Sequence, residues 1–158
     1  MLGRPDDAKL LRMLHGAAED TGDRIRMVCD RITNQQIVKI LQDCCSNRDE
    51  MIPLVKAALD ELHAPLEDSE RRICCPASWF DLSDSATETG NYGPLLLKLA
   101  DCDEIVKGRL EEASETADLS ASTRLAIDEA IILLDETVKK FRRIVEQSDG
   151  KAKDEAAA

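Results

Sequence analysis

The sequence predicts an all-α protein, a single four-helix-bundle domain over residues 1–147. Hydrophobic residues make up 43% of the 158-residue chain but aromatic residues only 3%, a balance that suits helices packed on helices better than a sheet. In four long segments the apolar residues recur at steps of three and four, which places them along one face of a helix. A chain of this length can bury a core as one domain.

Local signals divide the domain into its helices. Four long helices are expected, over residues 6–32, 34–62, 94–117 and 121–147. Thr33 or Asn34 can cap the second helix, and Ser120 or Ser122 can cap the last one. Pro94 suits the first turn of the third. Because the connection between the first two helices is very short, they should lie side by side and antiparallel.

A long connection separates the two pairs of helices. Residues 63–93 contain two prolines and two glycines, with a short helix expected from residue 77 to about residue 88. Two antiparallel hairpins joined by one long crossover have the connectivity of ferritin-like bundles. The tail, residues 148–158, continues no apolar seam, so we expect it to be flexible.

Several motifs occur in an order that resembles a family of short, mostly bacterial, ferritin-like four-helix-bundle proteins whose domain has no assigned function. They are "AAEDTGDRI", "SNRDEMIPLVKAALDEL", "PASWFDL", "DCDEIVKGRLEEA" and "LSASTRLAIDEAI". The resemblance covers nearly the whole chain and implies a ferritin-like fold. It implies little about activity.

The number and positions of the histidines argue against a di-iron site. Such a site takes a Glu from each of two helices and a Glu-x-x-His motif from each of the other two. The chain has two histidines, His15 and His63, and the residues three positions before them are Arg12 and Asp60. Asp60 and His63 have the required separation but lie at the very end of their helix. We therefore expect no di-iron site, no cofactor and no catalytic residue.

A metal-binding alternative depends on a different set of residues. Its candidate ligands are the carboxylates of Glu19, Asp49 and Asp103, with Cys74 and Cys75 in the crossover. None of the six cysteines forms a Cys-x-x-Cys motif, the usual spacing of zinc and redox sites. The cysteines on the long helices are expected to be reduced and to pack as small hydrophobic side chains.

Arg48 stands where an apolar side chain is expected. The seam of its helix reads Val38, Leu41, Cys45, Arg48, Ile52, Val55, Leu59 and Leu62. Asp103 occupies the corresponding position on the helix over residues 94–117. Because a buried charge without a partner is very costly, we predict an Arg48–Asp103 ion pair inside the bundle. Asp49, Asp20 or Glu19 could replace Asp103 as the partner of Arg48. The alternative to a buried ion pair is that the Arg48 side chain extends past its neighbours into solvent.

The net charge of −11 makes two kinds of binding partner unfavourable, nucleic acids and anionic membranes. There is no excess of Lys and Arg to replace counterions, so we expect no binding to nucleic acid or to an anionic membrane. No apolar run approaches the roughly 20 residues of a membrane span, and the first residues form no signal peptide, so we expect a cytoplasmic protein. The leading interpretation is a non-enzymatic structural or interaction protein, as a homodimer or with a protein partner. The alternatives are a metal-binding or di-iron oxidoreductase-type bundle, and an adaptor that binds a partner helix in a groove.

Overall fold

A computed structural model describes residues 5–65, 78–116 and 118–157. These residues form five α-helices and no strand, so the all-α prediction is confirmed. The helices are α1 (Pro5–Cys29), α2 (Gln35–Glu61), α3 (Ser78–Thr89), α4 (Gly93–Thr116) and α5 (Ala121–Ala157). None of the described helices combines the length and the apolar character needed to cross a membrane.

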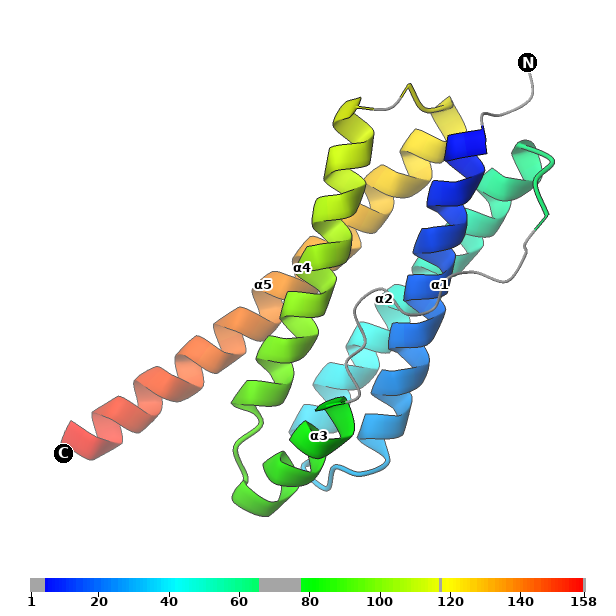
Figure 1. Cartoon of the computed structure of the whole chain (residues 1–158). Helices are drawn as coiled ribbons and strands as arrows, with labels where there is room; N and C mark the ends of the chain where they lie inside the picture. The colour runs from blue at the N-terminus through cyan, green and yellow to red at the C-terminus, as the bar shows by residue number, and fades with distance from the viewer. Residues whose placement is uncertain (1–4, 66–77, 117, 158) are drawn as a thin grey trace.

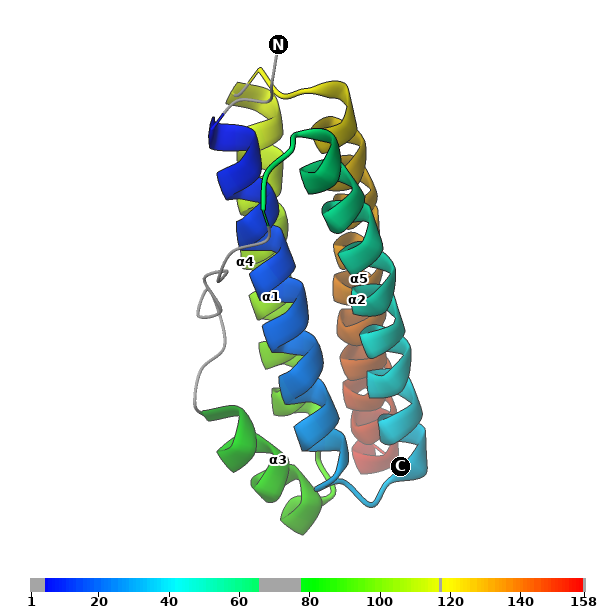
Figure 2. The same cartoon turned by 90° about the vertical axis from the view of Figure 1, so that its right-hand side faces the viewer.

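The four long helices pack lengthwise (Figures 1 and 2). α1 and α2 form one antiparallel hairpin, α4 and α5 form another, and α2 and α4 run in the same direction. The closest packing is within each hairpin, and α2 also packs along α5. The short helix α3 lies near the turn between α1 and α2 and beside the start of α4. Long-range packing therefore joins the two hairpins mainly through α2 and α5.

Polar caps fix where the helices begin. The Asn34 side-chain oxygen accepts hydrogen bonds from the backbone N–H groups of Gln36, at 3.0 Å, and Ile37, at 3.3 Å. Ser120 Oγ accepts one from the backbone N–H of Thr123 at 3.4 Å, at the start of α5. A side-chain acceptor satisfies N–H groups that have no partner inside the first turn of a helix. Two of the predicted capping residues thus have this role.

Two ends of the long helices differ from the prediction by more than one residue. α1 ends at Cys29 instead of residue 32, and α5 continues to Ala157, through the tail that was expected to be flexible. Seven of the 11 residues after residue 147 are Ala, Lys or Glu, and none is proline. Since Ala, Lys and Glu are strong helix formers, a helix can continue there without burying an apolar face. Figure 1 shows these last turns leading away from the start of α4.

The core consists of two separate apolar clusters. One lies near the turn between α1 and α2 and contains Ile25, Val28, Leu41, Leu96, Phe141 and their neighbours. The other lies towards the opposite end and contains Leu14, Val55, Leu59, Leu110, Ile127 and their neighbours. Burial of these side chains stabilises the bundle. Along each long helix the two clusters are separated by polar residues.

Candidate functional site

Four buried polar side chains, one from each long helix, lie between the two apolar clusters. They are Thr21 on α1, Arg48 on α2, Asp103 on α4 and Thr137 on α5, each at most 3% exposed. Along its own helix, each falls between residues of one cluster and residues of the other. We call these four residues the central polar layer. They occupy the middle of the bundle, where a ferritin-like protein with a di-iron site holds its metal ions.

Arg48 and Asp103 form an ion pair in the interior. Arg48 Nη2 donates to Asp103 Oδ2, and both side chains are almost completely buried. Arg48 Nε donates to Thr21 Oγ1 at 3.2 Å, and that hydroxyl donates to the carbonyl of Ala17 at 2.6 Å. The guanidinium therefore connects α2 with both α1 and α4. The structure thus brings together Arg48 and Asp103, the two residues that were predicted to pair from their positions on the apolar seams.

The surroundings keep Arg48 charged. Burial is the largest single influence on the pKa of Arg48 and would lower it, but the charge and hydrogen bond of Asp103, together with Cys44 and Cys102, outweigh burial and the pKa is raised. Burial raises the pKa of Asp103 above its ordinary value, although the charge and the hydrogen bond of Arg48 act in the opposite direction. Each charge is thus tolerated in the interior because the other is present.

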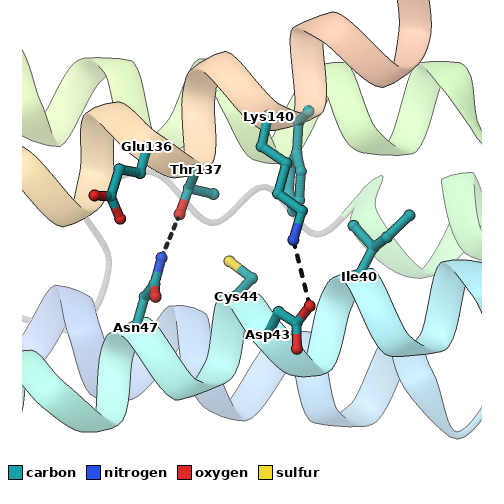
Figure 3. A pocket seen from close by; sticks show the side chains of 8 residues that line it. Ile40, Asp43, Cys44, Asn47, Glu136, Thr137 and Lys140 are labelled. Atoms are coloured by element: carbon teal, nitrogen blue, oxygen red, sulfur yellow. Dashed lines mark hydrogen bonds and ion pairs between the residues drawn. The ribbon is translucent and has the colours of Figure 1, made fainter.

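A pocket of about 150 Å³ lies between α2 and α5, next to the central polar layer (Figure 3). Asn47 Nδ2 donates to Thr137 Oγ1 at 3.1 Å on one side of it, and Lys140 pairs with Asp43 at 3.3 Å on another. Figure 3 shows the Cys44 thiol between these two pairs. Burial raises the pKa of Cys44 to about 12. Because the reactive form of cysteine is the thiolate, Cys44 is not equipped to act as a nucleophile.

The other candidate residues are engaged outside the central polar layer. The exposed Asp49 pairs with Arg26 at 2.9 Å, and Asp20 pairs with Arg24 at 3.3 Å. Glu19 lies 3.3 Å from Nε2 of the buried His15. These acids are therefore not the partners of Arg48. Cys74 and Cys75 lie outside the described residues.

Among the described candidate ligands, the structure does not bring Glu19, Asp49 and Asp103 together. Within residues 5–65, 78–116 and 118–157, no group of three or more His, Cys, Asp or Glu side chains is arranged to hold a metal ion. Asp103 faces Arg48, whereas Asp49 lies on the surface. His63 follows the end of α2 with a backbone φ of 53°, away from the middle of the bundle. The acids that could have met in a site thus serve in separate ion pairs.

Sequence reasoning missed the two threonines of the central polar layer. Thr21 and Thr137 stand on the apolar seams of their helices, so their positions were visible, but both were counted as ordinary seam residues. Thr137 accepts from Asn47 and donates to the carbonyl of Leu133 at 3.2 Å. Each long helix has a polar residue in the middle of its apolar seam, and this pattern could have predicted the central polar layer from the sequence.

Comparison with known proteins gives no relative. No protein family, no curated protein and no solved structure matches this chain. The arguments about function therefore depend on the geometry of the central polar layer and of the pocket beside it.

The ion pair predicts strong coupling between two substitutions. Arg48→Met should destabilise the protein by about 3–5 kcal/mol, since it leaves a buried acid without its partner. The double variant Arg48→Met/Asp103→Leu should be much more stable than the sum of the two single changes predicts, because it removes both buried charges. Denaturant unfolding of the four proteins of this cycle measures the coupling. If the two changes simply add, the residues do not interact in solution.

The same cycle should depend on pH. Burial already holds the pKa of Asp103 above its ordinary value, although Arg48 acts to lower it, so the removal of Arg48 should raise that pKa further. A group with a raised pKa in the folded state adds stability below its unfolded pKa and loses it as pH rises through the folded pKa. The deficit of Arg48→Met should therefore be smaller at pH 4 than at pH 7, whereas Arg48→Met/Asp103→Leu should lack this change. An equal deficit at both pH values would contradict a buried Asp103.

The described cysteines should react slowly. Cys29, Cys44, Cys45 and Cys102 are not in disulfides, and burial raises the pKa of even the half-buried Cys29 from 9.0 to about 11. Such a rise lowers the thiolate fraction at pH 8 about 100-fold. In a Cys74→Ser/Cys75→Ser variant, a thiol reagent should react at least about 100-fold faster after denaturation than before it.

Two results would oppose this account of the thiols. One is fast reaction of the native variant. The other is that most of the six cysteines of the freshly isolated wild-type protein, denatured without reductant, are found in disulfides.

Proposed function

We propose that this protein is a non-enzymatic structural or interaction protein, built as a ferritin-like four-helix bundle in which an ion pair replaces a metal centre. The observation that carries the proposal is the buried guanidinium of Arg48 in the middle of the bundle, paired with Asp103. A cytoplasmic location and reduced cysteines form part of the proposal.

The helix arrangement supports the ferritin-like class. Two antiparallel hairpins are separated along the chain by the segment between α2 and α4, and α2 and α4 run in the same direction. A connection between the ends of two such helices has to return along the length of the bundle. The short helix α3 belongs to this connection and is held beside the first hairpin by an Arg31–Asp84 ion pair of 3.2 Å.

The charge of Arg48 opposes metal binding at the centre. A fixed positive charge repels a divalent cation strongly in a region of low dielectric constant. The guanidinium also occupies the carboxylate of Asp103, the acid of the central polar layer. The other two members of the layer are threonines. A bundle with these four residues at its centre has an internal ion pair where a metal-binding bundle would need ligands.

In a structural protein, the ion pair would serve to align the two helical hairpins. Arg48 belongs to the first hairpin and Asp103 to the second, so their contact specifies how the hairpins align. The hydrogen bond between Asn47 and Thr137 also joins the two hairpins. A sliding of one hairpin along the other by one turn would separate the charges in an apolar interior. Buried polar residues select one register of helices in this way in coiled coils.

Metal analysis tests the proposal. Protein purified without added metal, and again after incubation with Fe²⁺, Mn²⁺ or Zn²⁺ followed by desalting, should retain far less than one ion per chain. The Arg48→Met variant is the matched comparison, because it keeps Asp103 and removes the positive charge. Two ions per wild-type chain, lost on substitution of Asp103, would favour the oxidoreductase-type alternative. Sedimentation velocity of the same samples shows whether the wild-type protein is a homodimer.

A further inference from the structure

One nitrogen of the central ion pair has no hydrogen-bond acceptor among the described residues. Arg48 uses Nε for Thr21 and Nη2 for Asp103, but its buried Nη1 atom donates to neither protein side chain nor backbone. The residue is only 2% exposed, so bulk solvent does not reach this group. Buried polar groups in folded proteins nearly always have a partner, and this holds more strongly for a charged donor.

A small cavity adjoins this ion pair. Its volume is about 10 Å³, and its wall includes residues from all four long helices. The polar residues in the wall are Thr21, Arg48 and Asp103, and the remainder of the wall is apolar. A cavity holds a water molecule when it offers roughly 10–15 Å³ and two to four polar partners. This cavity meets the lower limit of size and offers three polar residues.

We propose that this cavity is the binding site of one buried water molecule. The water accepts a hydrogen bond from Arg48 Nη1 and donates to the carboxylate of Asp103. Its second hydrogen is directed to Thr21 Oγ1, whose own hydrogen is used for the carbonyl of Ala17. A hydroxyl oxygen has two acceptor sites, and Arg48 Nε uses one of them. The water thus gives Arg48 Nη1 the acceptor that it lacks among the described residues.

The charge at the site favours water over an ion. The ion pair has no net charge, so it provides no excess positive charge for an anion. The carboxylate of Asp103 repels anions, and the guanidinium of Arg48 repels cations. Water is neutral and both donates and accepts, which matches the mixture of donor and acceptors around the cavity.

A high-resolution crystal structure of the wild-type protein tests the proposal directly. The expected result is one electron-density peak at about 2.7–3.2 Å from Arg48 Nη1, without anomalous signal. The absence of a peak there overturns the proposal. So does an anomalous peak at that position in crystals grown with bromide, or one from a bound metal. A metal peak would contradict the proposed function as well, whereas an empty cavity would contradict only the water site.

A substitution in the wall gives an independent test. Val106→Ile adds one methyl group in the wall of this cavity. The control is Val55→Ile, which adds the same group at a buried position of the same apolar cluster that does not line the cavity. If water is displaced, Val106→Ile should lower the melting temperature more than Val55→Ile does. It should also remove one long-lived water from the oxygen-17 relaxation dispersion of the wild-type protein. A higher melting temperature, a fall no larger than that of Val55→Ile, or an unchanged water signal overturns the proposal.

Discussion

The interaction between Arg48 and Asp103 constrains the rest of the bundle. Both side chains are withdrawn from water, and each would be costly to bury alone. The pair can exist only when α2 and α4 are aligned so that the guanidinium meets the carboxylate. α2 packs closely against α1 and α5 but not against α4. The long side chain of Arg48 therefore reaches across the interior, and the alignment of one hairpin fixes that of the other.

The division of the core follows from this constraint. Charged groups need polar partners, and Thr21 on α1 is one for Arg48. Thr137 lies between the same two clusters on α5 and accepts a hydrogen bond from Asn47. Leucine, isoleucine and valine then fill the space on either side as two separate clusters. Replacement of a buried ion pair by apolar residues often stabilises a protein, so the pair is better understood as a source of specificity than of stability. A unique alignment of the helices is what the proposed structural or interaction role requires of the core.

The heptad pattern was sufficient to place the four long helices, because the apolar spacing that defines them extends over many turns. It also turned Arg48 and Asp103 inward, since their seam positions follow from the same spacing. It favoured Asp103 as the partner of Arg48 but could not exclude Asp49, Asp20 and Glu19. That choice depends on how the helices are rotated about their axes. The same rotation lets Asp49 and Asp20 form ion pairs with arginines of α1 instead. The helical tail was missed because its helix formation is local and leaves no apolar seam.

The most direct test of this account is the exchange with water of the Nε–H proton of Arg48, measured by NMR on nitrogen-15-labelled protein. The account predicts a resolved signal that exchanges much more slowly than that of Arg142, whose side chain is 45% exposed on α5. Arg48→Lys, which removes the guanidinium group, should remove only this slow signal and so assign it. Exchange of the Arg48 proton as fast as that of Arg142 would show that the guanidinium reaches solvent, and would contradict a central ion pair.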